Sequence, residues 1–205
     1  MVKIKICGIT TEEDVGDLNK AGVDFAGFVQ FYPQSKRNIP LEQAVRLMRR
    51  LNPQIQKVAV TVEPDREQLL LLAEAGFDIV QIHGDVSDAL LDGSPLPVWK
   101  AFNVTDLSSF ERFQRHTAVS GFVFDAMFPG SGKEFNWEIL DKLPRTDKLT
   151  MLAGGLRPDN VAAALKRTNV DGVDTSSGVE KDFGAGKDSE KIQAFVRAVK
   201  GEGSI

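Results

Sequence analysis

Short apolar segments alternate with longer amphipathic segments along most of the chain. The short segments are rich in Val, Ile and Phe and have the length of buried strands. They predict strands at Lys3–Cys7, Phe25–Val29, Lys57–Val62, Ile79–Ile82, Val98–Phe102, Gly121–Asp125, Leu149–Ala153 and Asp171–Asp174. Because strand and helix patterns alternate, the sequence predicts parallel strands that are joined by helical crossovers.

The intervening segments carry apolar residues at helical spacing and predict helices. They lie at Thr11–Ala21, Leu41–Leu51, Asp65–Ala75, Ser87–Leu91, Asp106–His116, Pro158–Arg167 and Ser189–Lys200, with a short turn near Trp137–Leu143. Thr10 and Glu13 have the spacing of a capping box for the first helix. The apolar face of Asp106–His116 is weak, which leaves open that this fifth helix is reduced.

Eight strand–helix units predict an α/β protein with one (β/α)8 barrel that spans residues 1–205 as a single domain. A typical barrel of this kind takes about 250 residues, so this one is expected to be compact, with short loops. A doubly wound open sheet is the alternative. The barrel is favoured because candidate functional residues follow many strands and do not gather at one switch point.

Composition narrows the functional classes. The formal net charge is −4 and no long basic run is present, which argues against a nucleic-acid partner. No apolar stretch approaches the roughly 20 residues of a membrane helix. The one cysteine excludes an intrachain disulfide, and Met1-Val2-Lys3 leads directly into a strand with no secretory pattern, so a cytoplasmic protein is expected. No His, Asp or Glu set has metal-ligand spacing, so no metal is expected.

In such a barrel, functional residues lie at the carboxyl ends of the strands and in the loops that follow. Cys7 ends the first strand and Asp125 ends the sixth. A thiol becomes a usable base in positive surroundings, although a lone cysteine is more often a small buried hydrophobe. An aspartate at the barrel mouth could be a general acid or a cap for the next loop. The two strands are not neighbours in the ring, so the two groups could approach a substrate from different sides.

Two glycine-containing loops follow the seventh and eighth strands, where barrels often bind phosphate. They contain Gly154-Gly155 and Thr175-Ser176-Ser177-Gly178. Glycine lets backbone N–H groups close around an anion, and a short helix starting near Gly178 would add its dipole. Ordinary turn glycines are the alternative interpretation.

Two further polar residues follow strands. Arg37 lies in the loop after the second strand, and its guanidinium could hold a carboxylate through two hydrogen bonds or be a solvated loop cation. His83 follows the fourth strand and could be a base, a ligand or, by type the commonest case, a polar wall residue.

The motifs, taken together, resemble the phosphoribosylanthranilate isomerase family of tryptophan biosynthesis from Lys3 to about Lys200. The matching segments are Lys5-Ile6-Cys7-Gly8-Ile9-Thr10, Gly27-Phe28-Val29, Phe31-Tyr32-Pro33-Gln34-Ser35-Lys36-Arg37, Gln81-Ile82-His83-Gly84, Phe124-Asp125, Gly130-Ser131-Gly132-Lys133, Phe135-Asn136-Trp137, Ala153-Gly154-Gly155-Leu156 and Val173-Asp174-Thr175-Ser176-Ser177-Gly178-Val179-Glu180. Their shared order over most strand ends makes the resemblance specific.

The resemblance implies an Amadori rearrangement of N-(5-phosphoribosyl)anthranilate, with Asp125 as the acid that opens the furanose ring and Cys7 as the base that removes the C2′ proton. It implies that Arg37 holds the anthranilate carboxylate, that His83 lies beside the pocket and that Asp174 orients either sugar hydroxyls or the loop after the eighth strand. The implied phosphate site consists of Gly154, Gly155, Ser176, Ser177 and Gly178. The implied partner is a small phosphorylated substrate, with no cofactor, and the chain is expected to be a monomer or a homodimer.

Two rival functions stay open at this point. A histidine-pathway or bifunctional isomerase would need a second phosphate site near the third and fourth strands, where Glu63 and Asp65 would repel an anion. It would also be expected to use two aspartates, whereas the first strand offers Cys7. The second rival is a non-catalytic phosphosugar-binding barrel, and the intact acid and base positions argue against it.

Overall fold

The computed structural model describes residues 1–125 and 144–201, and in them parallel strands form one closed ring. The strands are β1 (Lys3–Cys7), β2 (Phe25–Val29), β3 (Gln56–Val62), β4 (Ile79–His83), β5 (Val98–Asn103), β6 (Val119–Asp125), β7 (Leu149–Ala153) and β8 (Gly172–Thr175). They are hydrogen-bonded in chain order, and β1 pairs with β8 to close the barrel. The predicted (β/α)8 barrel is therefore confirmed, and the predicted strand ends differ by no more than two residues.

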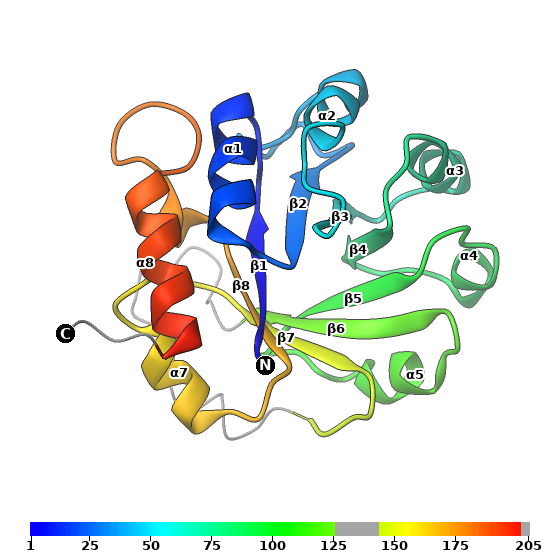
Figure 1. The fold of residues 1–205 in the computed structure, drawn as a ribbon. Helices are drawn as coiled ribbons and strands as arrows, with labels where there is room; N and C mark the ends of the chain where they lie inside the picture. Colours follow the sequence, from blue (N-terminus) through cyan, green and yellow to red (C-terminus); the bar gives the residue numbers. More distant parts are fainter. Residues whose placement is uncertain (126–143, 202–205) are drawn as a thin grey trace.

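The helices lie outside the ring of strands (Figure 1). They are α1 (Glu12–Ala21), α2 (Leu41–Met48), α3 (Arg66–Glu74), α4 (Asp88–Asp92), α5 (Phe110–Arg115), α7 (Val161–Arg167) and α8 (Ser189–Lys200), with the 3-10 turn η1 (Ser177–Val179) after β8. The predicted turn near Trp137–Leu143 lies outside the described residues, as do the motifs at residues 130–137.

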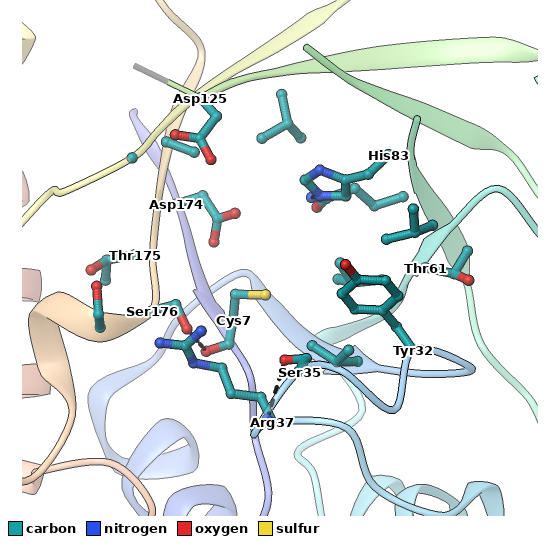
Figure 2. A pocket seen from close by; sticks show the side chains of 18 of the residues that line it. Cys7, Tyr32, Ser35, Arg37, Thr61, His83, Asp125, Asp174, Thr175 and Ser176 are labelled. Atoms are coloured by element: carbon teal, nitrogen blue, oxygen red, sulfur yellow. Dashed lines mark hydrogen bonds between the residues drawn. The ribbon is translucent and has the colours of Figure 1, made fainter. Parts of the chain in front are cut away.

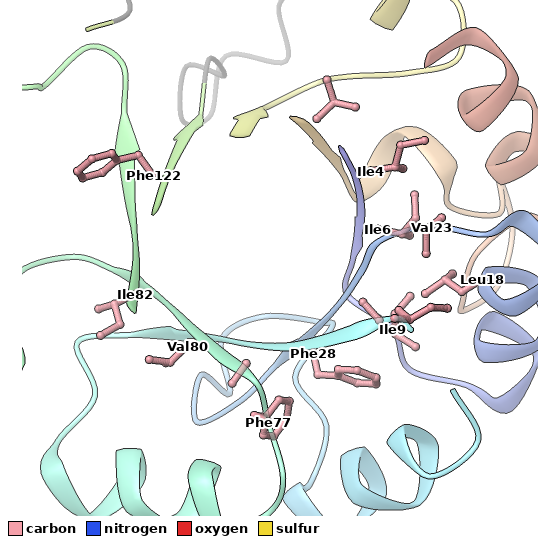
Figure 3. Packing of buried hydrophobic residues seen from close by; sticks show 14 of the residues in the cluster. Ile4, Ile6, Ile9, Leu18, Val23, Phe28, Phe77, Val80, Ile82 and Phe122 are labelled. Atoms are coloured by element: carbon pink, nitrogen blue, oxygen red, sulfur yellow. The ribbon is translucent and has the colours of Figure 1, made fainter. Parts of the chain in front are cut away.

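Strand alternation divides the buried residues into two layers. Alternate residues such as Ile4, Ile6, Phe28 and Val80 point outward and pack against the helices (Figure 3). The other face fills the barrel interior and includes Trp99. Toward the carboxyl ends of the strands some interior residues are polar, and a cavity with both polar and apolar walls opens at that end of the barrel.

The first helix begins one residue later than the predicted capping box requires. Thr11 is the N-cap, and its hydroxyl oxygen accepts a hydrogen bond from the backbone N–H of Asp14 at 3.1 Å. The Asp14 carboxylate accepts in return from the backbone N–H groups of Thr10 and Thr11. The prediction of Thr10 with Glu13 was therefore wrong by one position, because the buried Asp14 satisfies more backbone donors than Glu13 could.

The second helix ends at Met48 and not at the predicted Leu51, and two other predicted helices start later than expected. The fifth starts at Phe110, because Asp106 accepts from the backbone and hydroxyl of Ser108 and so stabilises a turn. The seventh starts at Val161, because Asn160 closes a turn by accepting from the N–H of Arg157 at 2.7 Å. Pro158 therefore belongs to that turn and not to the first turn of the helix.

Candidate functional site

A cavity of about 320 Å³ opens at the carboxyl ends of the strands, and Figure 2 shows its polar lining. Nine of the ten residues predicted for the site line this cavity: Cys7, Arg37, His83, Asp125, Gly154, Gly155, Asp174, Ser176 and Ser177. Strand-end position is what brings them together, since they come from six strands or the loops that follow them.

Gly178 is the predicted site residue that the structure leaves out of the cavity lining. It lies inside η1, and a Cβ at this position would meet the carbonyl oxygen of Leu156 at 2.0 Å. Glycine is therefore required here by the close packing of η1 against the loop after β7. Its part in phosphate binding stays a prediction.

Cys7 and Asp125 face the same cavity from different strands (Figure 2). Cys7 is the last residue of β1 and Asp125 the last residue of β6. In the ring, β1 pairs with β2 and β8, while β6 pairs with β5 and β7. The thiol and the carboxyl group therefore border the cavity from separate parts of its wall, and in Figure 2 Asp174 lies between them.

A buried ion pair lies beside Cys7. Lys5 on β1 is 0% exposed, and its Nζ donates to Oδ2 of Asp174 on β8 at 2.9 Å. Burial alone would lower the pKa of Lys5, but the charges of Asp174 and Cys7 raise it more, so the net direction is above the ordinary value. The other carboxylate oxygen of Asp174 is buried and has no hydrogen-bond partner among the described residues, and Asp174 lines the cavity. A ligand hydroxyl would satisfy that oxygen.

Arg37 reaches the cavity across Gly8. A Cβ at Gly8 would meet Cδ of Arg37 at 2.4 Å, and φ at Gly8 is +78°. Only glycine therefore leaves room for the Arg37 side chain to pass. Nε of Arg37 donates to the carboxylate of Glu180, which also contacts Lys36 at 2.8 Å. Partial burial would raise the pKa of Glu180, but hydrogen bonds from Arg37 and Lys36 lower it to about 2. Glu180 therefore stays ionised and fixes the guanidinium over the working pH range.

The loops after β7 and β8 have the composition of an anion site, and Ser176 of the second loop lies beside Arg37 at Gly8. Gly154 and Gly155 after β7 have φ values of +88° and +69°, a left-handed backbone that glycine adopts freely. Ser176 follows β8, and its hydroxyl donates to the carbonyl of Cys7 at 2.9 Å. The buried Lys187 donates to the carbonyl of Ser176 at 3.0 Å, which places a cation behind this loop. Burial lowers the pKa of Lys187.

His83 is a polar wall residue that is held by its neighbour on β4. Its Nε2 lies 2.9 Å from the side-chain amide of Gln81, and which of the two groups donates depends on the tautomer of the imidazole. Burial, followed by the charges of Lys5 and Lys100, lowers the pKa of His83 to about 4. Of the interpretations left open by the sequence, the structure favours the wall residue.

The lowered pKa of His83 predicts a pH dependence of stability. Between pH 4 and 6.5 the unfolded chain binds a proton that the folded chain does not, so stability rises with pH across this window. Raising the pH across this window should increase the free energy of unfolding by up to about 3 kcal/mol through His83. Urea unfolding of the wild type and of His83→Gln at several pH values measures it. Equal pH slopes in the two proteins would contradict the prediction.

The cavity also contains residues that the sequence analysis did not single out. Val29 and Tyr32 from β2 and its loop, with Val60 and Val62 from β3, form an apolar wall. Lys5 lies outside the cavity lining and was also missed, although strand alternation makes a residue two positions before Cys7 face the same way.

A (β/α)8 barrel whose cavity is lined by a thiol, a carboxyl group and two glycine-containing loops is typical of a barrel enzyme. Within residues 1–125 and 144–201, no group of three or more His, Cys, Asp or Glu side chains could hold a metal ion. None of the helices described is long and apolar enough to cross a membrane.

The chain belongs to the N-(5′-phosphoribosyl)anthranilate isomerase family, whose model matches residues 4–198. It is 41% identical over 205 residues to the N-(5′-phosphoribosyl)anthranilate isomerase of Pelobacter propionicus, covering 98% of this chain and 96% of that one. The crystal structure of phosphoribosyl anthranilate isomerase from Thermotoga maritima superposes with a TM-score of 0.86 at 35% identity, covering 98% of this chain and 100% of that one.

A further similar structure is of phosphoribosyl anthranilate isomerase in complex with reduced 1-(o-carboxyphenylamino)-1-deoxyribulose 5-phosphate. It has a TM-score of 0.81 and 33% identity, and the match covers 98% of this chain and 100% of that one. The family expected from the strand-end motifs is confirmed.

Proposed function

We propose that this chain converts N-(5-phosphoribosyl)anthranilate to 1-(2-carboxyphenylamino)-1-deoxyribulose 5-phosphate, an isomerisation in tryptophan biosynthesis. The observation that carries the proposal is the placement of Cys7 and Asp125 on one cavity, from strands that are not neighbours. Family membership supports the reaction, and the distribution of polar and apolar residues around the cavity supports the orientation of the substrate.

The substrate has three parts, and the cavity offers a matching region for each. The aromatic ring fits the apolar wall that contains Tyr32, with its carboxylate on Arg37. The phosphate fits the loops after β7 and β8, at Gly154-Gly155 and Ser176-Ser177. The pentose then lies between them, near the oxygen of Asp174 that has no hydrogen-bond partner in the described part of the chain.

The proposed reaction has two proton transfers. Asp125 donates a proton to the furanose ring oxygen, the C1′–O bond breaks, and the nitrogen lone pair forms the Schiff base. Cys7, as a thiolate, then removes the C2′ proton, and the electron pair of the C–H bond forms the C1′–C2′ double bond of an enolamine. Tautomerisation returns a proton to C1′ and gives the ketone, so the atoms balance without a redox partner or cofactor.

Purified full-length protein tests the proposal directly. N-(5-phosphoribosyl)anthranilate is generated in situ, and the loss of its fluorescence is followed with and without the protein. The expected result is a loss that is proportional to protein concentration and that yields the aminoketose. A folded protein that does not accelerate the loss above the protein-free reaction would overturn the proposal and favour a binding barrel. A cytoplasmic location and a monomeric or homodimeric state stay predictions.

A further inference from the structure

The proposed base has a charged neighbour on its own strand. Lys5 and Cys7 are two residues apart on β1, so both side chains point into the barrel. Lys5 is fully buried, and a buried ammonium group is costly unless it is paired and hydrogen-bonded. The lysine is therefore kept in the interior by specific partners, and those partners indicate its role.

One partner is Asp174, which accepts from Nζ of Lys5 at 2.9 Å. The other neighbour is the sulfur of Cys7. A Cβ placed on Gly27 of β2 would meet Sγ of Cys7 at 3.0 Å and Nζ of Lys5 at 3.1 Å. The sulfur and the ammonium group therefore border the same small space, which is open only because residue 27 is glycine.

Lys5 stays positively charged although it is buried. The nearby Asp174 and Cys7 more than offset the effect of burial on the pKa of Lys5, so the amine stays protonated. Oδ2 of Asp174 accepts a hydrogen bond from Lys5, and Oδ1 has no hydrogen-bond partner among the described residues. An ammonium group has three donors, so it can serve Asp174 and a thiolate together.

We propose that Lys5 is a positioning residue that holds Cys7 in its thiolate form through its adjacent positive charge. The inference rests on the proposed function only in naming the thiolate as the base. When the thiolate takes the C2′ proton, the C–H bond breaks, an S–H bond forms and the electron pair moves into the enolamine. Lys5 keeps its proton throughout, so it lowers the free energy of the thiolate without taking part in the transfer.

Other charged or titratable groups also surround Cys7 in the described part of the chain. They are Asp174 on β8, Tyr32 and Arg37 after β2, Lys187 before α8, and Asp125 and His83 across the cavity. Arg37 and Lys187 both contact Glu180, at whose carboxylate their charge is partly compensated. Lys5 is the cation whose ammonium group borders the space at Gly27 together with the sulfur. It is therefore the cation that we assign to stabilising the thiolate.

Cys7 is the only cysteine of the chain, so alkylation reports on it alone. The rate of reaction with iodoacetamide is measured from about pH 6 to about pH 10 for the wild type, Lys5→Gln and Lys5→Met. The midpoint of the rate–pH curve should move upward by about one pH unit or more in both variants. Lys100→Met removes another buried lysine that lies outside the cavity lining, and it should leave the curve unchanged.

Turnover gives a second readout that a merely structural role would not move. At neutral pH, kcat of Lys5→Gln should fall by about tenfold or more and recover as the pH is raised, because the thiolate then forms without the lysine. Lys5→Gln keeps a donor for Asp174. If Lys5→Met fails to fold, the double variant Lys5→Met with Asp174→Asn removes the uncompensated buried charge.

The two proposals fail in different ways. An unchanged alkylation midpoint in folded Lys5 variants would overturn the inference about Lys5, even if the wild type is active. A shifted midpoint together with a wild type that lacks turnover would support the effect of Lys5 on the thiol and overturn the proposed function. A loss of kcat in Lys5→Gln that does not recover with pH would also contradict the role proposed here.

Discussion

Replacing Cys7 with serine is expected to lower kcat by about a thousandfold while the affinity for a product analogue changes little. A hydroxyl group is a far weaker base than a thiolate, so removal of the C2′ proton becomes the slow step. The sulfur borders the cavity, and the backbone carbonyl of residue 7, which accepts from Ser176, is kept in the variant.

Substrate that carries deuterium at C2′ identifies the step that is impaired. In Cys7→Ser the C–H bond breaks in the rate-limiting step, so the deuterated substrate should react several-fold more slowly than the ordinary one. Binding of reduced 1-(o-carboxyphenylamino)-1-deoxyribulose 5-phosphate, measured by calorimetry, is the control for an intact cavity. Comparable kcat values for Cys7→Ser and the wild type would remove Cys7 from the mechanism.

The barrel was predictable because its pattern is local and repeated. Each strand is a short apolar run that is flanked by turn residues, and eight such runs leave few arrangements for the chain. The helix starts were less predictable. Whether Thr10 or Thr11 caps α1 depends on the burial of Asp14, which the sequence alone does not reveal.

Most of the candidate site was predictable from one geometric rule, because residues at the carboxyl ends of parallel strands meet at one end of a barrel. The rule places Cys7, Asp125 and His83 correctly on the cavity. It does not find Lys5, which lies one layer deeper, or the pairing of Arg37 with Glu180 from distant parts of the chain. Such pairs depend on three-dimensional packing, and strand alternation was the one local signal that pointed to Lys5.

The environment of β3 and β4 bears on the histidine-pathway alternative. At this side of the barrel, the carboxylate of Glu63 accepts from the backbone N–H of Asp85 at 3.1 Å. Glu63 and Asp85 therefore bring two acidic side chains to the ends of β3 and β4, and a phosphate bound near them would be repelled. This agrees with the family to which the chain belongs and supports a substrate with a single phosphate.

Replacing Asp125 with asparagine is expected to lower kcat by about a hundredfold to a thousandfold, because an amide cannot donate a proton to the ring oxygen. Asparagine has nearly the same shape, so β6 and the cavity should be kept. Asp125→Glu retains a carboxyl group and should keep more activity than the asparagine variant. If the two variants have equal kcat values, Asp125 acts by shape or charge placement and not as the acid.

The isotope effect should separate the roles of the two residues. In Asp125→Asn the opening of the furanose ring precedes C2′ deprotonation and becomes rate-limiting, so deuterium at C2′ should have almost no effect on kcat. In Cys7→Ser the same label should slow the reaction, as argued above. The opposite assignment, with Cys7 opening the ring and Asp125 removing the proton, predicts the reverse pattern. One labelled substrate and two single variants therefore decide which group on the cavity is the acid and which is the base.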